Sequence, residues 1–297
     1  MIEKKTVFIL GAGASHPYDY PLGYDLTVSI IDGLEAGQAM FETLAQADFS
    51  RAQMRSFQHA FRRSGKYSID SFLQHRKDLS EIGRAAIAYQ IMSKEDPARL
   101  YAAPRDRDWY RHLVSRMDAP ASQFEKNAVS FITFNYDRSL QYYLVQHLAG
   151  SHKLHDDIAS SIVAKFPFIH LHGDVGLLPG FGRSARRYDS QFDPDEVRAC
   201  ASRIHIVYDE LADREASFKQ AKVEIESAER IVMLGLGFDR TNLERLGLNQ
   251  TGKPVWATCM GLTDLERSEV EQFCQGRLGL WNNTDCLAAF RQNVSLT

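Results

Sequence analysis

Polar side chains that could do chemistry follow short apolar runs in this chain. Asn135 and Asp137 come directly after the run Val129–Phe134 and offer an amide and a carboxylate two positions apart. His172 ends another apolar run and precedes a glycine. A histidine titrates near neutral pH and can take a proton or bind a hydroxyl group. Because the carboxyl ends of parallel strands form ligand sites in open α/β sheets, these three side chains are the first candidates for a site.

Each candidate also has a purely structural explanation. Asp137 could cap a helix that starts near Arg138, and Asn135 could satisfy a turn. A histidine at a strand end often bonds only to a backbone carbonyl group. The strand period of two also predicts that His170 and His172 lie on one face of the same strand. From these residues alone, both explanations stay open.

Two glycine-rich segments follow apolar runs, and either could approach a phosphate group. They are Gly11-Ala12-Gly13-Ala14-Ser15 and Gly235-Leu236-Gly237. A glycine turn between a strand and a helix lets backbone amides come close to a pyrophosphate. The first segment has His16 where the dinucleotide-binding fingerprint has its third glycine, and tight turns need glycine for backbone reasons alone. Two such turns in one sheet would suit a ligand with two phosphate or ribose ends.

Two helix starts are visible in the second half of the chain. Asp239 is placed to cap a helix that runs through Leu243, and Asn242 in its first turn could reach a ribose. An asparagine is equally natural in the first turn of a helix. Thr263 and Glu266 have the spacing of a capping box.

The apolar runs that carry these residues are typical of strands buried on both faces, because they lack polar alternation. Helical patterns lie between most of them, which predicts a Rossmann-like parallel α/β sheet with helices on both faces. The predicted strands are Thr6–Leu10, Val129–Phe134, Phe166–Leu171, Ile204–Tyr208, Ile231–Leu234 and Val255–Met260.

One region breaks the alternation of strands and helices. From about residue 27 to residue 124 the pattern is helical, with an apolar stripe from Ile69 to Ile87 that predicts one long helix. We expect a Rossmann-like core of residues 1–26 and 125–297 and a helical insertion of about 27–124, which could form one wall of a ligand cleft. Residues 173–195 are rich in glycine and arginine and are predicted to be a mobile loop.

Composition and charge exclude several classes of protein. The chain has 297 residues, of which 44% are hydrophobic and 25% charged, which excludes disordered and fibrous proteins. The formal charge of −3 argues against a protein that coats nucleic acid or an anionic membrane. No apolar stretch approaches the roughly 18 residues of a membrane span, and Thr6–Leu10 is too short for a signal peptide. The four cysteines form no Cys-x-x-Cys pair, so we expect no metal site and a soluble, cytoplasmic protein.

Taken together and in order, these motifs resemble the sirtuin (silent information regulator) family. They are most similar to its bacterial sirtuin-like branch, whose members hydrolyse NAD in anti-phage defence. The resemblance implies a single sirtuin-like domain over residues 1–297. The matching pieces are Gly11–Ser15, Tyr20-Pro21-Leu22-Gly23 with Leu26, Ile69-Asp70-Ser71-Phe72-Leu73, Thr133-Phe134-Asn135-Tyr136-Asp137, His172-Gly173 and Gly235-Leu236-Gly237.

The resemblance also implies a role for each matching residue. Asn135 would contact the nicotinamide ribose and the attacking water, Asp137 would hold the nicotinamide carboxamide, and His172 would act on the ribose hydroxyls. The residues that would bind the rest of NAD are Gly11, Ala12, Gly13 and Ser15 at the phosphates and Gly235 and Gly237 at the adenosine end. Deacylating sirtuins carry two Cys-x-x-Cys pairs for a structural zinc, which this chain lacks, so a zinc-free NAD hydrolase is expected rather than a deacylase.

The expected reaction is cleavage of the nicotinamide N-glycosidic bond of NAD to give nicotinamide and ADP-ribose. Since unregulated loss of NAD would kill the host, we expect gating by homo-oligomerisation, by a partner or by the helical insertion. The family suggests a separately encoded defence partner such as a HerA-type ATPase or a short Argonaute. No direct contact with nucleic acid or a membrane is expected.

Three other functions remain open at this point. The same cleft could bind NAD or ADP-ribose as a signal without catalysis, although the presence of both Asn135 and His172 favours an enzyme. A nicotinamide-dependent oxidoreductase is disfavoured by the missing third glycine. Transfer of ADP-ribose to a macromolecule would require the same first bond cleavage.

Overall fold

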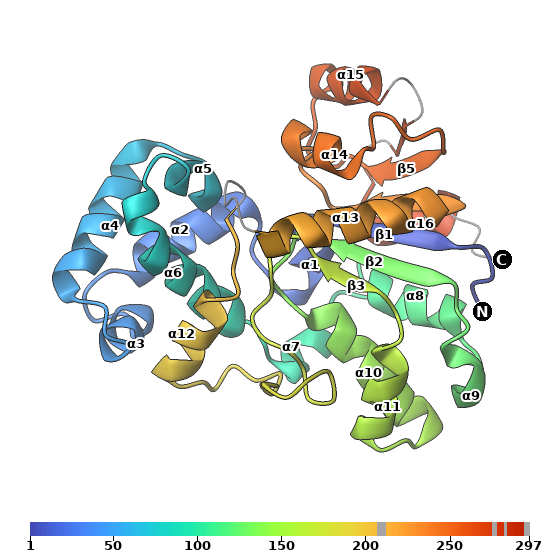
Figure 1. The fold of residues 1–297 in the computed structure, drawn as a ribbon, viewed down its shortest axis with the longest axis horizontal. Helices are drawn as coiled ribbons and strands as arrows, with labels where there is room; N and C mark the ends of the chain where they lie inside the picture. Colours follow the sequence, from blue (N-terminus) through green and yellow to red (C-terminus); the bar gives the residue numbers. More distant parts are fainter. Residues whose placement is uncertain (207–211, 275–277, 282–283, 294–297) are drawn as a thin grey trace.

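The centre of the molecule is a parallel sheet of six strands in the order β3-β2-β1-β4-β5-β6 (Figure 1). The computed structural model describes residues 1–206, 212–274, 278–281 and 284–293. This strand order is that of a Rossmann-like fold, in which ligands bind where the order reverses, here on either side of β1. The strands are β1 (Thr6–Leu10), β2 (Val129–Thr133), β3 (Phe168–His170), β4 (Arg230–Leu234), β5 (Val255–Thr258) and β6 (Leu278–Trp281).

Five of the six predicted strands are confirmed. The sixth, Ile204–Tyr208, is wrong for residues 204–206, the part of it that the structure describes. Residues 204–206 follow a helix, and Ile204 and Ile206 are buried without pairing in the sheet. Burial against side chains therefore explains this apolar run, and the remainder of it lies outside the described residues. The strand β6 was not predicted because it is short and contains a glycine.

The lack of polar alternation in β1 follows from burial on both of its faces. Phe8 and Leu10 belong to one apolar cluster, and Val7 and Ile9 belong to another. Phe8 stacks on Phe131 of β2 with ring centroids 5.6 Å apart. Helices cover both clusters, which confirms the predicted Rossmann-like α/β class.

The chain between β1 and β2 is mainly helical, as predicted. Helices α2 to α6, joined by α12 from much later in the chain, form a unit beside the sheet that we call the helical lobe (Figure 1). The helix α8 packs instead against α10 and α16 at the sheet. The helical segments before β2 are α1 (Ala12–Ser15), η1 (His16–Tyr18), α2 (Gly23–Gly33), α3 (Ala39–Gln46), α4 (Arg51–Ser64), α5 (Ile69–Leu73), η2 (Lys77–Leu79), α6 (Ser80–Met92), α7 (Pro97–Tyr101), α8 (Trp109–Met117) and α9 (Ala121–Phe124).

The later helices alternate with the strands, and their predicted caps are present. Asp239 accepts a hydrogen bond from the Asn242 amide, and Thr263 and Glu266 form the capping box. These helices are α10 (Ser139–His152), α11 (Asp156–Val163), α12 (Pro194–Ala201), α13 (Ala212–Ser227), α14 (Arg240–Leu246), α15 (Asp264–Phe273) and α16 (Cys286–Asn293). No helix in the described ranges has the length and apolar character needed to cross a membrane.

The prediction of one long helix from Ile69 to Ile87 is wrong, because the chain turns back between α5 and α6. The apolar stripe is buried, but two helices share it. Leu73 of α5 lies over Gly83 of α6, where an added Cβ would be 2.5 Å from Leu73 Cδ1. In a continuous helix these two residues would be about 15 Å apart. Long-range packing therefore decides where the helix breaks.

The segment predicted as a mobile loop follows an irregular path that a buried ion cluster holds at several points. The Arg138 Nε lies 2.6 Å from Glu95 Oε1, and Arg186 also donates to Glu95. Arg138 further donates to the carbonyl oxygens of Leu177 and Arg186 at 2.7 and 3.0 Å. All three ionic side chains are buried. This cluster of Glu95, Arg138 and Arg186, called the Glu95 cluster below, connects the helical lobe, the start of α10 and residues 177–187.

Candidate functional site

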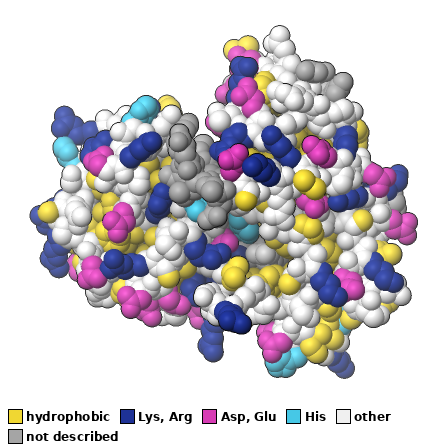
Figure 2. All heavy atoms as spheres, in the orientation of Figure 1, with side chains coloured by type: hydrophobic (Ala, Val, Ile, Leu, Met, Phe, Trp, Pro, Cys, Tyr) yellow, Lys and Arg dark blue, Asp and Glu magenta, His cyan; other side chains and the backbone are white. Residues whose placement is uncertain are grey.

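A cavity of about 420 Å³ opens where β1, β2 and β4 end, between the sheet and the helical lobe. Cavities that bind small molecules typically have roughly 300–1,000 Å³. In the space-filling view the molecule is hollowed between the helical lobe and the helices α14 and α15 (Figure 2). Both glycine turns and the helical segments α2 and α5 contribute to its wall. The cavity therefore lies at the reversal point of the strand order, where Rossmann-like folds bind ligands.

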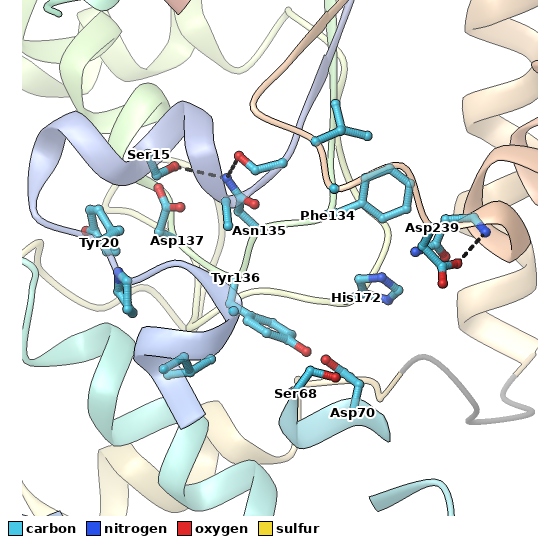
Figure 3. Close-up of a pocket in the computed structure, with 18 of the residues that line it drawn as sticks. Ser15, Tyr20, Ser68, Asp70, Phe134, Asn135, Tyr136, Asp137, His172 and Asp239 are labelled. Atoms are coloured by element: carbon cyan, nitrogen blue, oxygen red, sulfur yellow. Dashed lines mark hydrogen bonds between the residues drawn. The ribbon is translucent and has the colours of Figure 1, made fainter. Parts of the chain in front are cut away.

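The three predicted catalytic side chains line this one cavity. Asn135 and Asp137 come from the segment after β2, and His172 comes from the segment after β3 (Figure 3). These two strands are neighbours in the sheet, so their carboxyl ends bring the three residues together. The sequence motifs thus converge on one place in the fold, and the roles of the three residues stay a proposal.

Asn135 is held through hydrogen bonds at several of its polar groups. Its side-chain nitrogen donates to Gly11 O at 2.8 Å and to Ser15 Oγ at 3.0 Å, and its backbone amide donates to Thr133 Oγ1 at 3.0 Å. With both amide hydrogens donated, the side-chain oxygen Oδ1 is the atom that can accept a hydrogen bond from a ligand or a water. The side chain of Asn135 thereby joins the first glycine turn to the end of β2.

Asp137 lies just before the start of α10 and also lines the cavity. Its Oδ1 accepts hydrogen bonds from the backbone amide, at 3.1 Å, and the hydroxyl of Ser139 in the first turn of α10. The residue is buried and also lines the cavity. The helix therefore fixes one carboxylate oxygen, and the other can accept a hydrogen bond from a ligand.

His172 lies beyond the end of β3, so the strand alternation that was expected to place it beside His170 does not apply. The residue is 4% exposed, and its ring lies 5.4 Å from the ring of Phe134. Its carbonyl accepts from the His205 amide at 2.9 Å, and Gly173 then turns the chain away with a φ of 76°. His170 does not line the main cavity, whereas His172 does.

The two glycine turns pack backbone against backbone. The amide of Gly11 donates to Leu234 O and that of Gly13 donates to Gly235 O, each at 2.9 Å. Gly13 and Gly235 lie behind the cavity wall, whereas Gly11, Ala12, Ser15, Gly237 and Asn242 line it. Gly13 and Gly235 therefore contribute by bringing the turns together, and any contact of theirs with a ligand stays a prediction.

Replacing Gly235 by alanine should destabilise the fold by about 2–3 kcal/mol. Gly235 has a φ of 64°, and an added Cβ would lie 2.2 Å from the Ala14 backbone nitrogen. The matched control is Gly237→Ala in the same turn, where nothing lies within 4 Å of the added atom. Urea unfolding of the three proteins measures the difference. Equal stability of the two variants would show that the turns do not depend on this close approach.

Several lining residues escaped the reasoning from chemistry and spacing. Tyr136 points toward Ser68 and Asp70 of the helical lobe, across the mouth of the cavity (Figure 3). Asp70 appeared only inside a family-like motif, and nothing in its spacing signalled a site. Asp239 was expected as a helix cap, and it also lines the cavity.

The cavity is acidic. The described residues that line it include Asp70, Asp137 and Asp239 and no lysine or arginine. Within the described ranges, no three His, Cys, Asp or Glu side chains gather in a group that could hold a metal ion. The four cysteines are free and buried.

Comparison with known proteins gives little beyond this geometry. No protein-family profile matches the chain, and no curated protein matches it either. Among solved structures, the chain is similar to that of Sir2Tm bound to a propionylated peptide. The identity is 15%, the alignment covers 97% of this chain and 90% of that chain, and the TM-score is 0.41. A similarity this low supports no conclusion about activity.

Proposed function

We propose that this chain is an NAD glycohydrolase that uses water to cleave the bond between nicotinamide and ribose. The observation that supports this most is the convergence of Asn135, Asp137 and His172 on one cavity at the reversal point of a Rossmann-like sheet. The ordered motifs that resemble sirtuin-like NAD hydrolases point to the same substrate. The products would be nicotinamide and ADP-ribose.

The acidic lining of the cavity suits the charge that this reaction develops. As the bond from C1′ to the pyridinium nitrogen breaks, its electron pair moves to that nitrogen and neutral nicotinamide leaves. Positive charge then appears on the ribose as an oxocarbenium ion, as it does in other glycoside cleavages. Asp70, Asp137 and Asp239 provide negative charge in a cavity whose described lining has no cationic side chain. Such fixed charges stabilise a developing cation because they need not reorganise.

Asn135, Asp137 and His172 would each have a different role in this reaction. The second oxygen of Asp137 would accept a hydrogen bond from the nicotinamide carboxamide. The Oδ1 of Asn135 would accept one from the water whose oxygen attacks C1′. His172 would bond to the ribose hydroxyls and take up the proton that the water loses. Positioning of this kind can lower the activation free energy by several kcal/mol.

The glycine turns would hold the phosphates and the adenosine end of NAD. Because the amides of Gly11 and Gly13 already donate to backbone carbonyls, contacts to phosphate would come from Ala12 and Ser15. Gly237 and Asn242 line the far side of the cavity, where Asn242 would reach a ribose. Substrate binding would thus use both turns that the sequence singled out.

The wider role in this proposal is that of a zinc-free effector in bacterial anti-phage defence by abortive infection. It is supported by the motif resemblance and by the lack of Cys-x-x-Cys pairs in the sequence. The activity would be gated in the cytoplasm by homo-oligomerisation or by a separately encoded partner such as a HerA-type ATPase or a short Argonaute.

The test is release of nicotinamide from NAD, followed by chromatography that also quantifies ADP-ribose. We expect the two products in equal amounts. The assay is made with the protein alone and then with the product of its genomic neighbour. Nicotinamide without free ADP-ribose would indicate transfer to a macromolecule, and NAD binding without nicotinamide in both assays would indicate a sensor, so both results would contradict hydrolysis.

A further inference from the structure

His170 lies directly behind Asn135. It is the last residue of β3, is half-buried, and its Nδ1 lies 3.1 Å from the backbone oxygen of Asn135. Because a carbonyl oxygen only accepts hydrogen bonds, Nδ1 must carry the hydrogen. We propose that His170 is a positioning residue that fixes the orientation of Asn135, an inference that rests on the proposed role of Asn135 in NAD hydrolysis.

The contact of His170 completes the anchoring of Asn135. The backbone amide and the side-chain nitrogen of Asn135 are bonded to Thr133, Gly11 and Ser15. The carbonyl group is the remaining backbone polar group of Asn135, and the imidazole of His170 bonds to it. Without that bond the peptide plane after Asn135 could rotate, and the side-chain Oδ1 would move with the backbone. A displacement of about 1 Å at a reacting centre can cost a factor of roughly 100 in rate.

The position of His170 is itself fixed from two sides. Its backbone is in register with Thr133, since β2 and β3 pair Thr133 with His170. Asp174 is close enough to interact electrostatically with the ring, and Arg203 holds that carboxylate through two hydrogen bonds of 2.8 and 2.9 Å. Burial opposes ionisation of Asp174, but Arg203 and His170 together hold the pKa of this carboxyl below its ordinary value. The pairing of β3 with β2 therefore fixes the backbone of His170, and the carboxylate held by Arg203 interacts with its ring.

His170 acts through Asn135 in this proposal and does not touch the substrate. It is absent from the described lining of the main cavity. It lines two smaller hollows instead, one together with Asp174 and Arg203 and the other behind Asn135 and Asp137. Its connection to the site is thus an indirect one, through the carbonyl group of Asn135.

Three substitutions distinguish positioning from simple packing. In His170→Asn the side-chain nitrogen lies near the position of the histidine Nδ1 and can still donate to the Asn135 carbonyl. In His170→Gln the nitrogen lies farther from the backbone, near the position of Nε2. His170→Leu has no hydrogen-bond donor. We expect kcat for nicotinamide release to stay within about threefold in His170→Asn and to fall about 10- to 100-fold in the other two. The KM for NAD should change less than twofold, because the residues that would bind the phosphates, the adenosine end and the carboxamide of NAD are unchanged.

A second readout does not depend on catalysis. The side-chain amide signals of Asn135, identified by their loss in an Asn135→Ala spectrum, should be protected from hydrogen exchange in the wild type and in His170→Asn. They should shift and exchange faster in His170→Gln and His170→Leu. If the wild type released no nicotinamide while this pattern held, the proposed function would fail and the positioning role would stand. Unchanged Asn135 signals in His170→Leu, or equal loss of kcat in all three variants in step with their melting temperatures, would overturn the positioning role.

Discussion

Replacing Asn135 by alanine is expected to lower the rate of nicotinamide release from NAD by about 100- to 1,000-fold. The substitution removes the Oδ1 that would orient the attacking water, together with the hydrogen bonds to Gly11 and Ser15. Since Asn135 lies at a strand end and not in the apolar core, the fold should persist. His172→Ala should give a loss of similar size, because it removes the contact to the ribose hydroxyls.

The control for both substitutions is Gln123→Ala, an exposed residue of α9, which precedes the amino end of β2, whereas the cavity lies at the carboxyl ends of the strands. It should release nicotinamide at the wild-type rate. Circular dichroism and melting temperature establish that each variant is folded. Undiminished turnover in a folded Asn135→Ala or His172→Ala protein would remove these residues from the mechanism.

Replacing Glu95 by glutamine is expected to destabilise the protein by about 3–5 kcal/mol. Glu95 is fully buried between Arg138 and Arg186, so the change leaves two cationic groups in the interior without their carboxylate. Burial already lowers the pKa of Arg138 to about 10, which shows that its charge is poorly solvated there. Urea unfolding monitored by circular dichroism measures the loss.

Glu125→Gln is the matched control for Glu95→Gln. Glu125 pairs with Lys165 in an ion pair whose side chains are 35% and 57% exposed. Exposed pairs of this kind contribute about 1 kcal/mol or less. If the two variants were equally stable, the Glu95 cluster would not hold the fold together. Because Arg138 follows Asp137, Glu95→Gln should also reduce NAD cleavage, while Glu125→Gln should not.

Local sequence patterns predicted five of the six strands, because each of these five carries its own apolar signal. The runs at Thr6–Leu10 and Ile231–Leu234 lack polar alternation, which is typical of strands in a parallel sheet covered on both faces. Asn135, Asp137 and His172 were found because polar residues at the ends of such runs stand out. Their meeting at one cavity follows from the neighbouring positions of β2 and β3.

The features that were missed depend on contacts between distant parts of the chain. The residues around Glu95 and Arg138 carry no pattern that predicts burial, and only the fold buries the two together. The break between α5 and α6 follows from the packing of Leu73 on Gly83, which no local propensity encodes. Asp70 reaches the cavity because the helical lobe folds over it. The periodicity of a single segment does not show which distant segment will pack against it.

The central claim is that Asn135 and His172 act together on the ribose of one NAD molecule, and the most direct measurement is a structure of the Asn135→Ala protein with NAD bound. We predict that the nicotinamide ribose hydroxyls lie within hydrogen-bonding distance of His172. The vacated side-chain position of residue 135 should face C1′ of the same ribose. NAD bound elsewhere, or bound with its nicotinamide ribose away from both positions, would contradict the claim.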